Sequence, residues 1–247
     1  MTACTVSWLM SNDQARRYYN SFSGGYERER HKGYHRWLDE QSVSIVAPLA
    51  ENARVLEVGC GTGLILKEVA PLAEYAVGLD ISAGMLEYAR ARQLNVIQSS
   101  ATAIPFPDNY FDLIYSFKVL AHVPDISLAL MEMTRVLKPG GRLALEFYNK
   151  RSLRYLIRRV RPSLEVGVDT DESQIFTRFD DLADLKAQLP PNLSFTGTAG
   201  LRVATLLPQV FKVPGVGRMW AGFENLLSTS PLRVFGGFLV VLAQKQS

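Results

Sequence analysis

Short apolar runs alternate with longer amphipathic stretches over most of the chain. The apolar runs predict buried strands, and the stretches between them predict helices because their apolar positions recur every three or four residues. The predicted strands are residues 54–58, 76–80, 95–98, 111–116, 142–147, 193–205 and 238–244. Strands that alternate with helices are typical of an α/β fold with a mostly parallel sheet.

The predicted helices lie between and before these strands. They are residues 11–50, as two helices joined near Gly24 and Gly25, and then 64–72, 83–92, 126–137, 150–161 and 179–189. Residues 165–177 lack a clear period, which predicts an inserted loop or lid. Residues 206–235 form an apolar insertion that either roofs a pocket or makes a dimer contact, and the sequence leaves both interpretations open.

The strand at 54–58 leads into a loop with glycine at every second position, at Gly59, Gly61 and Gly63. Glycine permits a tight turn and lets a ligand approach backbone N–H groups with no Cβ in the way. The positive end of the following helix points into the same space. The loop therefore predicts a nucleotide-like ligand, although alone it is also compatible with a plain tight turn.

The next strand ends in a carboxylate, Asp80, about 20 residues after the loop, which is the spacing of an adenosine-binding βαβ unit. A carboxylate at this position can accept hydrogen bonds from both hydroxyls of a ribose. Asp80 or Ser82 can also cap the helix that follows, and the two roles are compatible.

Four motifs occur in order: Glu57–Gly63, Gly78–Ser82, Pro105–Asp112 and Leu137–Leu143. Together they resemble the motifs of class I S-adenosylmethionine-dependent methyltransferases, over residues 43–149 and the last strand. Within this family, the sequence is similar to the quinone-biosynthesis and natural-product methyltransferases, which act on small molecules. The resemblance implies a Rossmann-like, seven-stranded sheet with helices on both faces and a last strand that runs antiparallel beside the fifth.

The same resemblance implies one compact domain in three parts. Residues 1–50 would form a helical cap, residues 51–149 the S-adenosylmethionine-binding core, and residues 150–247 the rest of the sheet with acceptor-pocket insertions. The implied cofactor-binding residues are Glu57, Gly59, Cys60, Gly61, Gly63, Asp80, Ile81, Met85, Ala101, Thr102, Ser116 and Phe117. Relatives usually carry an acidic residue near Ser100 for the adenine amino group. Here Ser99, Ser100, Thr102 and the Ala101 N–H offer weaker, uncharged contacts instead.

The acceptor side is implied less sharply. Residues 116–118, Ala121 and His122 should border the transferred methyl group, at the point where strand order reverses. His122 is a candidate general base, together with Tyr18 and Tyr19, although we favour helix entry and packing as the role of His122. Lys118 either neutralises an anionic acceptor or extends to solvent, and we favour the second. Glu146 and Tyr148 end the fifth strand and are expected to face the same region.

The predicted activity is methyl transfer to a small, hydrophobic or aromatic metabolite by in-line displacement. The alternatives are an RNA or protein substrate, or a cofactor-binding module without turnover. The helix at 150–161 carries a basic face that fits a solvated surface, a membrane surface or an anionic partner.

Composition limits the remaining possibilities. The formal net charge of +3 does not favour nucleic acid as a partner. Two cysteines, Cys4 and Cys60, argue against a disulfide framework, and with no signal peptide or spanning apolar run the expected location is the cytoplasm. No metal is expected, because Glu27, His31 and His35 offer too few ligands on their shared helix face. The expected oligomeric state is a monomer or a homodimer.

Overall fold

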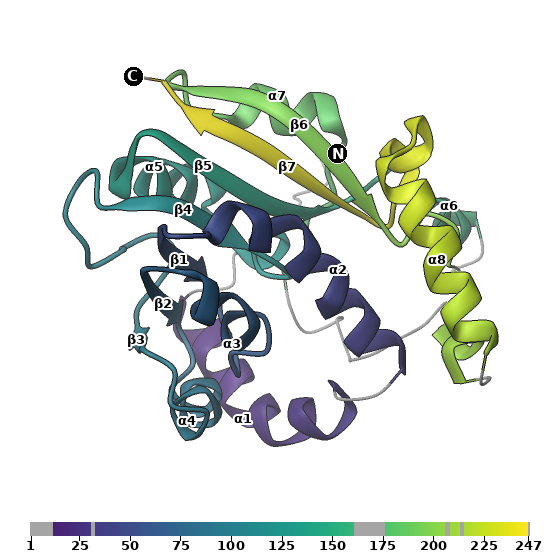
Figure 1. The fold of residues 1–247 in the computed structure, drawn as a ribbon, viewed down its shortest axis with the longest axis horizontal. Helices are drawn as coiled ribbons and strands as arrows, with labels where there is room; N and C mark the ends of the chain where they lie inside the picture. Colours follow the sequence, from purple (N-terminus) through teal and green to yellow (C-terminus); the bar gives the residue numbers. More distant parts are fainter. Residues whose placement is uncertain (1–11, 31–32, 161–175, 206–207, 213–214, 247) are drawn as a thin grey trace, which may run out of the picture.

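The computed structural model describes residues 12–30, 33–160, 176–205, 208–212 and 215–246. Within these ranges, seven strands form one sheet in the order β3-β2-β1-β4-β5-β7-β6 (Figure 1). They are β1 (Arg54–Val58), β2 (Tyr75–Asp80), β3 (Val96–Gln98), β4 (Phe111–Ser116), β5 (Leu137–Tyr148), β6 (Leu193–Leu201) and β7 (Phe238–Lys245). Strands β1 to β5 pair in parallel, and β7 runs antiparallel to both β5 and β6. The predicted Rossmann-like sheet, with the last strand antiparallel beside the fifth, is confirmed.

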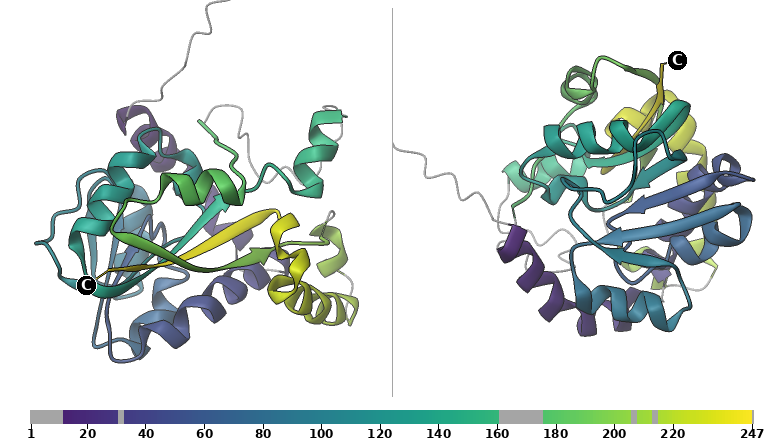
Figure 2. Two further views of the ribbon diagram at one scale, coloured as in Figure 1. Left: turned by 90° about the horizontal axis from the view of Figure 1, so that it is seen from above. Right: turned by 90° about the vertical axis from the view of Figure 1, so that its left-hand side faces the viewer.

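Helices cover both faces of this sheet (Figure 2). They are α1 (Asn12–Arg30), α2 (Gly33–Ala50), α3 (Leu66–Val69), α4 (Ala83–Ala91), α5 (Ile126–Val136), α6 (Leu153–Val160), α7 (Leu182–Gln188) and α8 (Val216–Thr229). Short 3-10 helices are η1 (Ala70–Leu72), η2 (Leu120–His122), η4 (Pro208–Lys212) and η5 (Pro231–Phe235). One buried apolar cluster lies beneath α5 and α7, and a second lies beneath α2. Neighbouring residues of β1 divide between them, Val55 facing α2 and Leu56 facing α5, because side chains alternate along a strand.

The strand order reverses between β1 and β4. From β1 the chain moves outward to β2 and β3, and then returns to the other side of β1 through β4 and β5. Ligands of open parallel sheets bind at the carboxyl ends of the strands, at such a reversal. The residues that end β1, β2 and β4 therefore frame the candidate site.

Four boundaries differ from the sequence-based prediction. The predicted break near Gly24 and Gly25 is wrong, because α1 continues through both glycines to Arg30. Helix α1 packs along α4, and a Cβ on Gly84 would lie 3.0 Å from the Ser23 hydroxyl, so this contact supports an unbroken helix. Glycine inside a helix costs only about 1 kcal/mol relative to alanine, and packing can offset that amount.

The other three differences concern lengths. The helix predicted at 64–72 contains only a four-residue α-helix, α3, followed by η1. Strand β5 starts at Leu137 instead of residue 142, and so includes Gly140 and Gly141. Strand β6 ends at Leu201, because Arg202 adopts a positive φ of 57° that leaves the extended conformation. Of the loop predicted at 165–177, only residues 176–177 lie within the described part of the chain.

Candidate active site

The loop after β1 needs glycine for its backbone. Gly59, Gly61 and Gly63 have φ values of 77°, 54° and 81°, in the region that residues with a Cβ rarely adopt. A Cβ on Gly59 would lie 2.2 Å from Val119, and one on Gly63 would lie 2.4 Å from Leu94. A Cβ on Gly61 would meet no heavy atom within 4 Å, so this residue has open space beside it. Gly61 is therefore the loop residue that a bound molecule can approach most closely.

The N–H groups of this loop bond to the protein. Those of Gly59 and Cys60 both donate to the carbonyl of Leu79, at 2.6 and 3.0 Å, and that of Gly63 donates to the Cys60 carbonyl at 2.8 Å. The Gly61 N–H donates to Asp80 Oδ2 at 2.8 Å. Four N–H groups of the loop therefore have partners within the protein, and the approach of a ligand to the loop backbone stays a prediction. The expected helix dipole is weak, because a four-residue helix aligns few peptide units.

Asp80 joins the loop to the end of β2. Its Oδ2 accepts the Gly61 N–H, and its Oδ1 accepts the Ser82 N–H at 2.8 Å. Burial raises the pKa of Asp80, while N–H donors from Ser82, Gly61 and Ile81 act in the opposite direction. A carboxylate has about four acceptor positions, so capacity remains for a ligand hydroxyl. The ribose role of Asp80 fits this geometry.

Ser82 is the N-cap of α4, as expected, because its hydroxyl accepts the Met85 N–H at 3.2 Å. The same hydroxyl donates to Asn20 Oδ1 at 2.7 Å, and Asn20 also accepts the Gly84 N–H at 3.1 Å. Asn20 thereby fastens α1 beside Asp80. Sequence reasoning missed Asn20, since nothing in the pattern distinguishes this residue from other polar positions of α1.

Glu57 lies on β1, and its backbone neighbour on β4 is Tyr115. The Tyr115 hydroxyl donates to Glu57 Oε2 at 3.2 Å. Burial raises the pKa of Glu57 well above its usual value, since the hydrogen bond from Tyr115 only partly opposes this effect. Burial likewise raises the pKa of the Cys60 thiol, whose sulfur lies 2.6 Å from where a Cβ on Gly78 would be. Both side chains are buried beside the loop, and their predicted contact with the cofactor stays a prediction.

The end of β4 is anchored to its surroundings. The Ser116 hydroxyl donates to the Val58 carbonyl at 2.8 Å, and Phe117 is buried in the cluster beneath α2. Lys118 has a positive φ of 62°, and its N–H donates to Glu146 Oε1 at 3.0 Å. These contacts fix the end of β4, and the cofactor-binding role of Ser116 and Phe117 stays a prediction.

Lys118 does not extend to solvent, so our favoured interpretation of it is wrong. Its ammonium lies 2.6 Å from Oδ1 of Asp39, and both side chains are largely buried. This ion pair ties the middle of α2 to the end of β4. Sequence reasoning missed Asp39, because its partner lies 79 residues away in the chain.

The structure brings His122 and Tyr148 together. Nδ1 of His122 lies 3.0 Å from the Phe176 carbonyl oxygen and 3.3 Å from the Thr177 hydroxyl. A carbonyl only accepts, so Nδ1 carries a hydrogen; in the neutral ring, Nε2 then has the lone pair that can accept from the Tyr148 hydroxyl, 3.4 Å away. The expectation that Tyr148 faces the region of His122 is confirmed.

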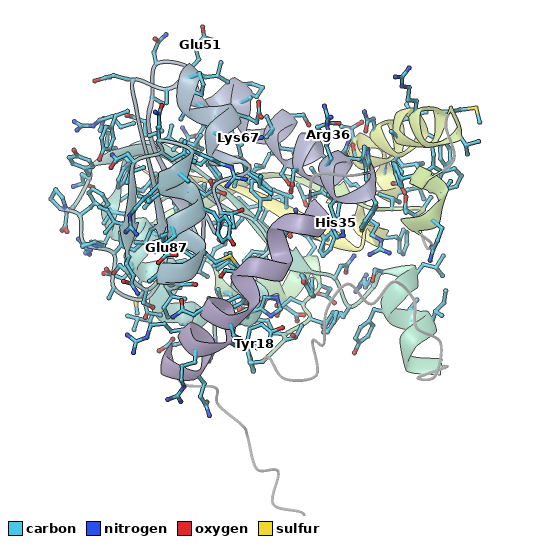
Figure 3. All side chains as sticks on the ribbon, turned by 90° about the horizontal axis from the view of Figure 1, so that it is seen from below. Tyr18, His35, Arg36, Glu51, Lys67 and Glu87 are labelled. Carbon is cyan, nitrogen blue, oxygen red and sulfur yellow. The ribbon has the colours of Figure 1, made fainter. Side chains whose placement is uncertain are left out.

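Further predicted site residues lie in the loop after β3 and on α1. Ser100 and Thr102 bond to each other through their hydroxyls at 2.8 Å, beside the buried Ala101. Tyr18 and Tyr19 lie on α1, which crosses α4 and approaches α2 (Figure 3). Their catalytic role, like the adenine contacts of residues 101–102, stays a prediction.

No cluster of three or more potential metal-ligating side chains is present in the described part of the chain. His31 and the side chain of Glu27 lie outside it. None of the described helices combines the length and the apolar character that crossing a bilayer requires.

Comparison with known proteins gives a match over the part of the chain that frames the site. Residues 56–145 match the family model described as "Methyltransferase domain". This range contains the glycine loop, Asp80 and the end of β4. Over these residues the chain is similar to the methyltransferase-domain family. The match spans the elements that frame the site, so the methyltransferase domain includes the whole strand-order reversal.

Relatives of this methyltransferase domain are found among curated proteins. A demethylmenaquinone methyltransferase of Lactiplantibacillus plantarum is 39% identical over 123 residues, which are 45% of this chain and 51% of that protein. The ubiquinone/menaquinone biosynthesis C-methyltransferase UbiE of Coxiella burnetii is 31% identical over 163 residues, 60% of this chain and 65% of that protein. The chain spans about half the length of the first curated relatives that it matches.

Solved structures share the fold over almost the whole chain. A Thermotoga maritima protein described as a "SAM-dependent methyltransferase, possible histamine N-methyltransferase" has a TM-score of 0.68 and 21% identity, over 93% of this chain and 99% of its own. The [4+2]-cyclase SpnF has a TM-score of 0.64 and 20% identity, over 96% of both chains. At this identity, the likeness establishes the fold.

Proposed function

We propose that this protein transfers a methyl group from S-adenosylmethionine to a small, hydrophobic or aromatic acceptor. The observation that carries the proposal is Asp80, which closes the glycine loop through Gly61 at the strand-order reversal and keeps acceptor capacity for a sugar hydroxyl. The match of residues 56–145 to the methyltransferase-domain model and the similarity to the named quinone methyltransferases support it.

The residues present fit the cofactor. The open space beside Gly61 would accommodate part of the cofactor. Asp80 would hold the ribose, and residues 99–102 would border the adenine. S-Adenosylmethionine supplies a methyl group on a positively charged sulfur. The protein's part in an in-line displacement is to hold donor and acceptor at reacting distance and to exclude water, which can supply several kcal/mol.

Aromatic side chains support an aromatic acceptor. Trp37 of α2 stacks on Phe211 of η4 with ring centroids 4.8 Å apart, and Tyr34 lies 5.7 Å from the same ring. Phe117, at the end of β4, belongs to the same cluster. Because η4 starts the 206–235 insertion, this packing favours a pocket wall over a dimer contact as the role of that segment.

The His122–Tyr148 pair supports proton removal from the acceptor. In the proposed step the acceptor's proton moves to the Tyr148 oxygen, while the Tyr148 proton moves to Nε2 of His122. Phe176 holds the histidine in the tautomer that this step needs. General-base catalysis of this kind typically contributes ~100- to 10,000-fold. An acceptor that is already nucleophilic would not need it.

The test uses the purified protein, donor tritiated on the methyl group, and a panel of prenylated naphthoquinols, benzoquinols and simple phenols. Labelling of a panel member, lost in Asp80→Ala, is the expected result. Tyr148→Phe and His122→Ala should lower turnover and leave donor binding intact, and turnover that is unaffected by both would remove the proton-transfer role. No label in any panel member, despite tight donor binding, would refute the small-molecule proposal.

The fold is shared with a protein described as a [4+2]-cyclase, so architecture alone does not establish methyl transfer. Two other functions are also compatible with the fold. A cofactor-binding module without turnover would bind the donor tightly and label nothing in a host extract. The alternative of an RNA or protein substrate depends on the basic face of the helix predicted at 150–161. The side chains of Arg154, Arg158 and Arg159 on that face lie outside the described part of the structure.

The proposal includes the organisation of the chain and its surroundings. Residues 1–50 would act as the cap, 51–149 as the cofactor core and 150–247 as the half that carries the acceptor insertions. Cytoplasmic location, a monomeric or homodimeric state, and the small-molecule acceptor as partner in place of nucleic acid stay predictions.

A further inference from the structure

Helix α8 carries an apolar stripe that faces away from the protein. The stripe consists of Val216, Met219, Phe223 and Leu226, which are three or four residues apart and so share one side of the helix. Met219 is 73% exposed, Leu226 69% and Phe223 46%. Single exposed apolar residues are common, but an ordered row of large ones on one face marks an interaction surface.

A neighbouring side of α8, which carries Trp220 and Glu224, already has its packing partners. Glu224 is buried and accepts the N–H groups of Val203 and Ala204 at 2.8 and 3.0 Å. The Trp220 indole donates to the Thr205 hydroxyl at 2.8 Å. These contacts fix the rotation of α8, so the exposure of the α8 stripe follows from how the helix is seated.

The charge around the α8 stripe is positive. Glu224 is the only carboxylate side chain between Leu193 and Ser247, and its hydrogen bonds keep it buried. Arg218 is exposed on α8, and Arg233 is partly exposed on η5. The neighbouring η5 also exposes Leu232 and Phe235. This part of the surface therefore combines apolar side chains with cations and presents no negative group from its own segment.

The same end of the molecule carries a second exposed apolar element. Figure 1 places α8 at the right-hand edge, with α6 at the same end, and the left view of Figure 2 agrees. Leu153 and Leu156 of α6 are each nearly half exposed. By contrast, the exposed Leu128 and Met131 lie on α5, away from this end of the molecule.

We infer that the α8 stripe docks on a lipid bilayer whose surface carries anionic headgroups. An amphipathic helix with large apolar residues and adjacent cations lies in the plane of such an interface. Each Arg or Lys near an anionic surface adds to the attraction. A second copy of this chain fits less well, because an isologous contact would bring Arg218 and Arg233 against the same segment of the partner, whose exposed charged side chains are cations.

The docking surface goes beyond the proposed methyltransferase activity and does not depend on it. A membrane-docked enzyme would also meet hydrophobic acceptors there. Helix α8 follows η4 within the 206–235 segment, and Phe211 of η4 packs on Trp37. Vesicle binding is measured with neither donor nor acceptor present, so its failure and the failure of the activity are separate results.

The test is flotation of the full chain with vesicles of phosphatidylcholine alone and of an equal mixture with phosphatidylglycerol. The triple variant Met219→Gln, Phe223→Gln and Leu226→Gln should bind mixed vesicles at least about tenfold more weakly than the wild type. The control, Leu128→Gln with Met131→Gln on α5, removes exposed apolar groups elsewhere and should bind like the wild type.

Charge is tested with Arg218→Glu, which should weaken binding to the mixed vesicles roughly fivefold or more and leave binding to neutral vesicles nearly unchanged. Arg90→Glu on α4 is its control and should bind like the wild type. Circular dichroism melts verify that each variant is folded. The inference is overturned if the wild type does not float, if the α5 control loses as much binding as the triple variant, or if the wild type is a dimer in sedimentation that the triple variant dissociates while neither floats.

Discussion

Replacing Asp80 by alanine should weaken S-adenosylmethionine binding by roughly 10- to 150-fold. The substitution removes an acceptor that would take a charge-assisted hydrogen bond from the ribose, worth about 1.5–3 kcal/mol, and each 1.4 kcal/mol corresponds to tenfold in the dissociation constant. The protein loses contacts as well, because the N–H groups of Gly61 and Ser82 both donate to this carboxylate. Gly61 is partly exposed and can bond to water, whereas Ser82 is buried. We therefore expect an additional stability loss of about 1–3 kcal/mol.

Isothermal titration calorimetry with the donor measures the affinity, and thermal melting without ligand measures the stability. Asp125→Ala is the matched control, because Asp125 also accepts a backbone N–H, that of Leu128 at 3.0 Å, as the N-cap of α5. The control should lose about 0.5–2 kcal/mol of stability and no affinity for the donor. A folded Asp80→Ala protein that binds the donor as tightly as the wild type would refute the assignment of the ribose site.

Three further predictions concern the supports of the site. Burial raises the pKa of Glu57 in the folded protein, so the folded state holds this proton more tightly than the unfolded state. The free energy of unfolding should therefore fall as pH rises above 4.5. In denaturant titrations Glu57→Gln should reduce this dependence on pH, and an unchanged dependence would contradict the prediction. Asp39→Asn removes the carboxylate that pairs with the largely buried Lys118 ammonium, which should lower the free energy of unfolding by about 3–5 kcal/mol. In a double-mutant cycle, Asp39→Leu combined with Lys118→Met should recover much of the lost stability. Additive losses would exclude coupling between the two residues. Gly59→Ala should lower the melting temperature through its positive φ and its overlap with Val119, at about 1–3 kcal/mol, and Val119→Ala should relieve part of that loss; equal losses in both backgrounds would rule out the overlap.

Local patterns determined the sheet and the position of the site. The strand cores, the positive-φ glycines and the carboxylate that ends β2 are each specified within a few residues, by alternating burial, by the steric freedom of glycine and by an N-cap serine. The break predicted near Gly24 failed because propensity is a weak local term, and the packing of α1 on α4 exceeds it.

What the tertiary structure decided is which distant groups meet. Asn20 reaches Ser82 across 62 residues, and Lys118 reaches Asp39 across 79. Neither contact leaves a periodic signal, because each depends on where two separately folded elements are seated on the sheet. The N–H groups of the glycine loop show the same limit. The sequence alone indicated a bend that a ligand can approach. Only the fold brought the Leu79 carbonyl and the Asp80 carboxylate within reach, so that the N–H groups of Gly59, Cys60 and Gly61 bond to the protein. Hydrogen bonds and ion pairs act over a few ångströms, so the residues that make them are known only once the fold has set those distances.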